Sequence, residues 1–334
     1  MTTRQSERYQ MQELLSAIQR TDSFLLFSHI SPDGDTVGSA LALKMALERL
    51  KKRVVLVLDG VVPESLFFLP DIYSFRKPDG EPLPTEGAIA IAVDVSSPER
   101  MGKALALYEQ APLTAQLDHH PTNPAYASIN VIDGDAPATA VVVFRLIEAL
   151  GLTLLREEAV CLYAALATDT GNFVYRNTNA EAFAMMARLM DAGLAVDTYA
   201  RLLFRRKDRR FVALLARALT TIEYFCDGAM VGLYVTQADL KAAGASDEHT
   251  DGLVDYAIDS AGVKLGYFAR ETADGKIKLS LRALAPYRVD QVAGLFGGGG
   301  HQLAAGCTLD APMEQALQTI RRELEKAYHG GARE

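Results

Sequence analysis

The chain has 334 residues, of which 49% are hydrophobic and 23% are charged. This is the composition of a folded globular protein, and it excludes a disordered, collagen-like or disulfide-framework chain. There are 34 lysines and arginines against 42 aspartates and glutamates, which gives a formal net charge of −8. A surface that docks as a whole on duplex DNA or on an acidic membrane is therefore disfavoured. The length favours two domains.

The cysteines and the N-terminal residues indicate the compartment. Cys161, Cys226 and Cys307 lie far apart and form no Cys-x-x-Cys pair, so neither a disulfide framework nor a thiolate zinc site is predicted. The first 15 residues contain no apolar segment of the signal-peptide kind, and no run of about 18 apolar residues occurs in the chain. We therefore expect a cytoplasmic protein without a membrane span.

Apolar runs alternate with helical patterns through the first half of the chain. After a helix near residues 11–20, strands are expected at residues 24–28, 53–58, 88–93 and 113–117, and helices at 38–51, 139–150, 157–168 and 181–192. Strands that alternate with helices predict an α/β fold with a doubly wound, mainly parallel sheet. Ligands bind such a sheet beyond the carboxyl ends of its strands.

The second half predicts a smaller mixed α/β domain. Strands are expected at residues 229–236, 262–270 and 276–284, and helices near 250–259 and 312–328. An Asp-Gly turn at residues 274 and 275 indicates that the last two strands form a hairpin. We therefore expect a first domain over residues 1–192, a helical connector over 193–220 and a second domain over 221–330.

Two smaller features of the second half have ordinary interpretations. The basic segment 201–210 is interpreted as a solvated face of the connector, with steering of a polyanionic substrate as the alternative. His249 and His329 are expected at the surface.

Carboxylates and histidines gather where the predicted strands end. They are His29, Asp33 and Asp35 after the first strand, Asp94 after the third, Asp118, His119 and His120 after the fourth, and Asp169 at a helix end. Carboxylates this close together repel one another unless cations or protons compensate them. Each aspartate alone could be only a helix cap, and a lone loop histidine only a structural residue. Their ordered recurrence at successive strand ends favours a two-metal centre that acts on a phosphoryl group.

Five segments of the chain, in order, resemble the motifs of the DHH phosphoesterase superfamily, in the branch with a DHH-associated C-terminal domain. They are HISPDGD, AVDVSSP, LDHHPTN, ATDTGNF and GGGGHQLAAG, and they span residues 29–306. The two-domain length, the LSLRAL segment and the GGGGH segment are similar to the NrnA-type enzymes. This resemblance implies a hydrolase that cleaves short oligoribonucleotides to mononucleotides and 3′-phosphoadenosine 5′-phosphate (pAp) to AMP.

The resemblance also implies the metal ligands and the metal. His29 and Asp33 would bind one ion, Asp35 and His119 the other, and Asp94 and Asp169 would bridge both. The ions would be two Mn²⁺, with Mg²⁺ or Co²⁺ as substitutes, and histidine with carboxylate ligands suits these metals. Residues 1–192 would then be the catalytic, metal-binding domain.

The resemblance further implies the residues that contact the substrate. His120 would face the scissile phosphate, while Asp118 would either orient a histidine or be purely structural. From the second domain, Arg282 and His301 would reach the phosphate across an interdomain cleft. The glycines Gly298, Gly299 and Gly300 would let the backbone come close to it.

Other functions stay open at this point. One alternative is a stand-alone phosphodiesterase for cyclic di-AMP or its linear product pApA. A second is a catalytically silent nucleotide- or RNA-binding protein, although no metal-ligand position is lost. A RecJ-type exonuclease and an inorganic pyrophosphatase are less well supported. The expected partners are short RNA and small nucleotides, without duplex DNA or a membrane, and a homodimer is compatible with the sequence.

Overall fold

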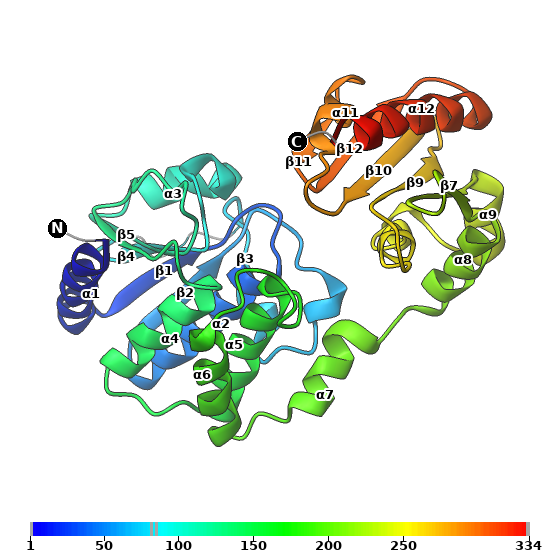
Figure 1. Cartoon of the computed structure of the whole chain (residues 1–334). Coiled ribbons are helices and arrows are strands. Elements are labelled where there is room, and N and C mark those ends of the chain that lie inside the picture. Colours follow the sequence, from blue (N-terminus) through cyan, green and yellow to red (C-terminus); the bar gives the residue numbers. More distant parts are fainter. Residues whose placement is uncertain (1–2, 81–82, 84–85, 332–334) are drawn as a thin grey trace. The chain divides into compact units, whose positions relative to one another are not determined.

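The computed structural model describes residues 3–80, 83 and 86–331, and the chain forms two compact units, residues 1–206 and 207–334 (Figure 1). The first unit is built on a six-stranded parallel sheet with the order β3-β2-β1-β4-β5-β6. Its strands are β1 (Ser23–Phe27), β2 (Arg53–Val57), β3 (Phe75–Arg76), β4 (Ile89–Val93), β5 (Leu113–Asp118) and β6 (Ile129–Ile132). The predicted doubly wound parallel sheet is confirmed, and the short edge strands β3 and β6 are additions to it. The strand order reverses between β1 and β4, which is where such sheets bind ligands.

Helices and 3₁₀ turns connect these strands. They are α1 (Thr3–Arg20), α2 (Gly34–Arg49), η1 (Glu64–Leu66), η2 (Ile72–Ser74), η3 (Pro98–Ala104), α3 (Leu105–Glu109), α4 (Thr139–Ala149), α5 (Arg156–Asp169) and α6 (Ala180–Asp191). Helix α2 begins four residues before its predicted start at residue 38. The reason is a cap, because the Asp33 carboxylate accepts hydrogen bonds from the backbone N–H groups of Asp35 and Thr36.

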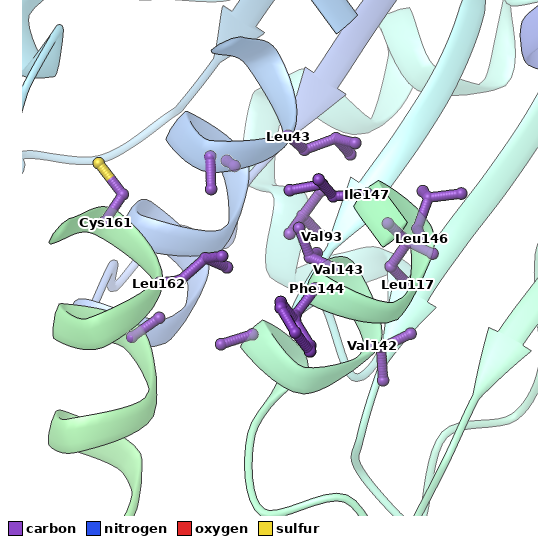
Figure 2. Packing of buried hydrophobic residues seen from close by; sticks show 14 of the residues in the cluster. Leu43, Val93, Leu117, Val142, Val143, Phe144, Leu146, Ile147, Cys161 and Leu162 are labelled. Atoms are coloured by element: carbon purple, nitrogen blue, oxygen red, sulfur yellow. The ribbon is translucent and has the colours of Figure 1, made fainter. Parts of the chain in front are cut away.

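Apolar side chains cover both faces of the first sheet. On one face, α2 and α4 lie on the strands and α5 packs against both helices. Figure 2 shows this cluster, in which Val93 and Leu117 of the sheet meet side chains of α4 such as Val143. On the other face, η3 and α3 cover a smaller cluster in which the rings of Phe27 and Tyr108 lie 5.4 Å apart. This burial fixes the carboxyl edge of the sheet, where the candidate site lies.

Two glycines let α2 and α5 approach each other closely. A Cβ atom on Gly34 would lie 2.1 Å from Thr168 Oγ1, and one on Gly38 would lie 2.3 Å from the carbonyl oxygen of Cys161. No side chain other than hydrogen fits at these distances. The close crossing brings the start of α2 next to the end of α5.

The segment predicted as a helical connector is helical but broken. Helix α7 (Val196–Ala200) continues into a π-helical turn, η4 (Arg201–Arg205), and a new helix, α8 (Arg209–Thr220), begins after Asp208. The division between the two units falls in this break, between residues 206 and 207. The basic residues 205–207, 209 and 210 are exposed.

The second unit contains a six-stranded mixed sheet with the order β11-β12-β10-β9-β8-β7. Its strands are β7 (Glu223–Phe225), β8 (Met230–Val235), β9 (Leu265–Glu271), β10 (Ile277–Ala283), β11 (Gly299–His301) and β12 (Ala304–Leu309). Besides α8, its helical elements are α9 (Gln237–Ala243), η5 (Asp247–Thr250), α10 (Asp255–Ile258), α11 (Asp290–Gly294) and α12 (Met313–Gly331). Helices α11 and α12 pack on one face, while α8, α9 and α10 pack on β8 and β9 from the other. The predicted smaller mixed α/β domain is confirmed.

One histidine of the second unit differs from expectation. His249 was expected at the surface and is instead 8% exposed, because the ring is held against the chain by its Nδ1, which accepts a hydrogen bond from the backbone N–H of Ser246.

Among the helices that the structure describes, none is both long and apolar enough to cross a membrane.

The close crossing of α2 and α5 gives a first prediction. In Gly38→Ala, the new methyl group overlaps the Cys161 carbonyl, so we expect the free energy of unfolding to fall by about 1–3 kcal/mol. Chemical denaturation in EDTA measures this change. Gly294→Ala is the control, because a Cβ atom there meets no atom within 4 Å. Equal stability of the two variants would contradict the argument.

Candidate metal centre

All six predicted metal ligands lie at the carboxyl edge of the first sheet. His29 follows β1, Asp94 follows β4, His119 follows β5, Asp33 and Asp35 lie at the start of α2, and Asp169 ends α5. The reversal of strand order between β1 and β4 and the crossing of α2 with α5 bring these elements together. The ligand atoms of the six residues form groups in which all distances are within 4.8 Å.

The first group consists of His29, Asp33 and Asp94. His29 Nε2 lies 3.6 Å from Asp33 Oδ2 and 3.7 Å from Asp94 Oδ2. These distances are too long for hydrogen bonds, but two ligands of one ion are about 3–4 Å apart when each bond is about 2.1 Å. His29 Nε2 is buried, and none of the described residues forms a hydrogen bond with it. An unpaired buried nitrogen facing two carboxylates fits a cation between them.

The second group consists of Asp35, His119 and Asp169. His119 Nε2 lies 3.9 Å from Asp35 Oδ2 and 3.5 Å from Asp169 Oδ2. It is also 3.8 Å from Asp94 Oδ1, whereas Asp94 Oδ2 faces His29. Asp94 thus turns one oxygen to each group. Among the described residues, Asp169 falls only in the second group, so its bridging of both ions stays a prediction.

The two most buried carboxylates among the six predicted ligands, Asp35 and Asp94, are held by the start of α4. Asp35 accepts hydrogen bonds from the backbone N–H groups of Thr139 and Ala140, at 2.7 and 3.0 Å. Ala138, at the N-cap of α4, has no side-chain oxygen that could accept hydrogen bonds from these N–H groups. Asp94 accepts a hydrogen bond from Thr139 Oγ1 at 2.9 Å, and its φ of 59° is strained for a residue other than glycine. These contacts fix the direction of both carboxylates.

Burial leaves the negative charge of the carboxylate cluster without compensation from water. Burial, with the charge of Asp33 acting in the same direction, raises the pKa of Asp35 to about 7 and that of Asp94 well above its usual range. For His119, burial lowers the pKa, but the charges of Asp35 and Asp94 outweigh it and the pKa rises. The four carboxylates of the predicted ligand set cannot all be ionised here unless cations compensate their charge. They are Asp33, Asp35, Asp94 and Asp169. The imidazole and carboxylate donors therefore fit a pair of divalent ions.

Asp118 holds His120 beside the metal-ligand groups. Asp118 is fully buried, and its Oδ1 lies 2.8 Å from His120 Nδ1. This hydrogen bond raises the pKa of His120. The same Nδ1 lies 3.7 Å from Asp94 Oδ1, so His120 could form a further ligand group with Asp94 and His119. Because Asp118 already engages Nδ1, the free atom of the ring is Nε2.

Arg100 is a residue of this site that sequence reasoning missed. Its Nη2 lies 3.2 Å from His29 Nδ1, and its Nη1 donates to Ser96 Oγ at 3.3 Å. Arginine can only donate, so His29 Nδ1 is the acceptor in this contact. When Nε2 binds a cation, Nδ1 must carry the ring proton, and the contact with Arg100 cannot persist. The guanidinium is then free for an anion. Its position two residues after AVDVSSP was the available signal.

Asn177 was also missed, although it follows ATDTGNF closely. Its Nδ2 donates to the carbonyl oxygens of Asp169 and Pro137, at 3.0 and 2.9 Å. It thereby fixes the end of α5, from which the Asp169 carboxylate projects.

In the second unit, the predicted phosphate-binding residues share one row of the sheet. Arg282 pairs with Ala304 of β12, which pairs with His301 of β11, so the side chains of Arg282 and His301 lie on the same face. Arg282 Nε is 3.4 Å from Asp255 Oδ1.

The glycines of the GGGGH segment lie against β12. A Cβ atom on Gly298 would lie 2.2 Å from the Gly306 carbonyl oxygen, and one on Gly300, which has a φ of 146°, would lie 2.6 Å from the Ala304 carbonyl oxygen. Both positions need glycine because β11 packs closely on β12. Gly299 has open space above it.

Comparison with known proteins identifies the class. The N-terminal domain of the DHH family matches residues 23–166, and the DHHA1 domain matches residues 230–330. The chain is 32% identical, over 94% of both chains, to the bifunctional oligoribonuclease and PAP phosphatase NrnA of Thermus thermophilus. The chain therefore belongs to the DHH family, in the group that carries a DHHA1 domain and includes NrnA.

Two further relatives extend this comparison. A crystal structure of an exopolyphosphatase-related protein from Bacteroides fragilis matches 96% of each chain, with a TM-score of 0.86 and 25% identity. The cyclic-di-AMP phosphodiesterase GdpP of Geobacillus thermodenitrificans is 24% identical over 98% of this chain but only 51% of its own.

The buried carboxylates give a prediction for the metal-free protein. The pKa of Asp35 is about 7 in the folded chain and 3.8 as the ordinary value, so the folded state binds more protons between these two pH values. Stability should therefore fall as the pH rises from about 4 to 7. Thermal unfolding in EDTA between pH 5 and pH 8 measures this. Added Mn²⁺ should raise Tm more at pH 8 than at pH 5, because the cation then compensates ionised carboxylates. A metal-free Tm that increases over this range would refute the prediction.

Proposed function

We propose that the chain is a two-metal phosphoesterase that hydrolyses short oligoribonucleotides to mononucleotides and pAp to AMP. The observation that carries the proposal is the placement of Asp94, with one oxygen toward each of two histidine–carboxylate groups. Support for the substrate class comes from the relationship to the Thermus thermophilus protein, whose name states both activities.

Two sets of residues would hold the cations. His29 and Asp33 would bind one and Asp35 and His119 the other, with Asp94 and Asp169 as the bridges. Mixed imidazole and carboxylate donors favour Mn²⁺, and Mg²⁺ or Co²⁺ are the substitutes. When bound, such a pair supplies Lewis-acid activation of water and of phosphoryl oxygens.

The chain's own donors act on the substrate phosphate. His120 presents Nε2, and the raised pKa that Asp118 gives it favours the protonated form, which donates to a phosphate oxygen. Arg100 binds a second oxygen through its planar pair of N–H donors. In the second unit, Arg282 and His301 bind phosphate from their common row. The open space above Gly299 leaves room for the substrate beside them.

Substrate preference is the direct test. With Mn²⁺, the wild-type chain should hydrolyse pAp and a diribonucleotide of another sequence at least as fast as pApA and faster than cyclic di-AMP, measured as kcat/KM by chromatographic product analysis. Preference for cyclic di-AMP, or for pApA over the other diribonucleotide, would favour the alternative that the relationship to GdpP suggests. Hydrolysis of none of the four, with Mn²⁺ shown to be bound, would leave the catalytically silent binding protein.

Two variants serve as controls for this assay. Asp94→Asn should lose both activity and bound Mn²⁺, because each group loses a ligand. His120→Asn should keep its Mn²⁺ content while kcat falls about 10²- to 10⁴-fold, since it loses a donor rather than a ligand.

Arg100 gives a prediction that separates substrate binding from metal binding. Arg100→Gln should lower kcat/KM for pAp at least about tenfold, since a charged bidentate contact with phosphate is lost. Its Mn²⁺ affinity, measured by calorimetry, should be unchanged or higher, because Arg100 then no longer favours the His29 tautomer whose proton is on Nε2, the atom that would bind the cation. Arg188→Gln on α6 is the matched control, because its ion pair is with Glu148. Weaker Mn²⁺ binding in Arg100→Gln would show that Arg100 instead supports the ligand His29.

A further inference from the structure

One face of the second sheet is only half covered. Helices α8, α9 and α10 pack over β8 and β9 on this face. Over β10, β12 and β11 the same face carries exposed residues, among them Lys278, Thr308 and His301. We call this uncovered part, formed by alternate residues of β10, β12 and β11, the open face.

The strand register orders the open face, together with the neighbouring residues of β9, into three rows. The first row contains Arg282, Ala304 and His301; the middle row contains Phe268, Ser280, Gly306 and Gly299; and the outer row contains Arg270, Lys278 and Thr308. Side chains of one row lie on the same face of the sheet and next to one another. Alternate residues along a strand are about 6.7 Å apart, so the outer row lies about 13 Å from the first.

The outer row carries cationic donors without a role in the proposed catalysis. Lys278 is exposed, and no ion pair or hydrogen bond joins its side chain to any of the described residues. Arg270, beside it on β9, is 8% exposed, and its Nη1 forms no well-directed hydrogen bond with any residue that the structure describes. Nη1 does lie 2.7 Å from Asp247 Oδ1, in a carboxylate that is itself 61% exposed. An exposed carboxylate can be exchanged for a phosphate at little cost.

The same arrangement occurs in the first row. Arg282, the predicted phosphate ligand, lies 3.4 Å from Asp255, whose side chain is 53% exposed. Each end of the open face thus has an arginine paired with an exposed aspartate, and the outer row has a free lysine in addition.

A small cavity joins the two rows. It has a volume of about 90 Å³, and its lining includes Thr250, Phe268, Arg270, Lys278, Ser280 and Arg282. Asp251 lines it as well, so local net charge does not distinguish the cavity. What distinguishes it is the series of hydroxyl, ammonium and guanidinium donors along its wall, from Arg282 in the first row to Lys278 and Arg270 in the outer row. The donors of the outer row, with Ser280, suit a phosphate group of their own.

We propose that Lys278, Arg270 and Ser280 form a second phosphate-binding subsite, which binds an oligoribonucleotide chain at a phosphate remote from the one at Arg282 and His301. The proposal rests on the proposed function. A stacked strand advances about 3.4 Å per nucleotide, and an extended strand advances further, so about 13 Å spans about two to four nucleotides. A substrate of five nucleotides reaches the outer row, whereas pAp and a dinucleotide do not. The subsite therefore adds affinity for the longer substrates only.

The length dependence of activity tests the subsite. In the full chain with Mn²⁺, Lys278→Ala should lower kcat/KM for a pentaribonucleotide about tenfold and leave pAp and a diribonucleotide within about twofold of the wild type. Lys278→Arg, which keeps the charge, should restore the pentanucleotide rate. Lys326→Ala removes the same charge from α12, which packs on the opposite face of the sheet, and should change none of the three rates.

Binding gives a second readout. In EDTA, the fluorescence anisotropy of a labelled pentanucleotide reports affinity without hydrolysis. The slope of log affinity against log salt concentration should be smaller by about 0.7 in Lys278→Ala, because one phosphate contact to a single strand is lost.

The outcomes separate the subsite from the proposed function. If the wild type hydrolyses none of the three substrates, the proposed function fails and the subsite fails with it. If the wild type hydrolyses all three but Lys278→Ala keeps the ratio of pentanucleotide to pAp rates, the subsite is wrong and the function stands. An equal loss on all three substrates would place Lys278 at the catalytic phosphate and would also overturn a separate subsite.

Discussion

Repulsion among buried carboxylates is the constraint around which the first unit is organised. Asp35 and Asp94 are 1% and 3% exposed, and both face further carboxylates and the imidazole of His119. Carboxylates so placed cannot relax into water, so their directions must be fixed by other contacts. The backbone N–H groups at the start of α4 and the hydroxyl of Thr139 supply those contacts. The remaining lone pairs are left pointing at one another, which is the arrangement that a cation stabilises.

The protein's own cations lie at the border of this cluster, not inside it. Arg100 contacts the far nitrogen of His29, and Asp118 holds His120 beside Asp94, whose Oδ1 lies 3.7 Å from His120 Nδ1. The inner charge is thus left for metal ions, while the outer donors remain for a substrate anion. The second unit also presents cationic donors to an anion. Arg270 and Arg282 each form an ion pair with an exposed aspartate, which an incoming phosphate can replace.

The sequence predicted the strands that form a long buried apolar run and missed shorter ones such as β3, β6 and β11. β1, β4 and β5 are almost wholly buried and were placed within one residue, since a continuous apolar run has few other interpretations. β3 has two residues and β11 is made of glycine and histidine, so neither leaves a hydrophobic pattern. The start of α2 was misplaced because the capping role of Asp33 depends on where its carboxylate points.

For the candidate site, the order of the motifs predicted which residues come together at the carboxyl edge of the sheet. It did not predict the contacts that fix the directions of their side chains. His29, Asp94 and His119 follow predicted strands, so parallel topology alone implied that they meet. Arg100 and Asn177 act through side-chain directions, in a 3₁₀ turn and a loop, that no periodicity encodes.

The double role of Asp35 ties the chemistry of the site to its architecture. This side chain is at once a candidate metal ligand and, in the described part of the chain, the acceptor for the N–H groups of Thr139 and Ala140 at the start of α4, because the side chain of Ala138 cannot accept a hydrogen bond. Replacing it removes a ligand and also frees the end of a helix that packs across the core of the unit. A loss of activity at this position therefore reports on folding as much as on catalysis. Sequence variation here is restricted by two independent demands, so the position should tolerate fewer residues than either demand alone would require.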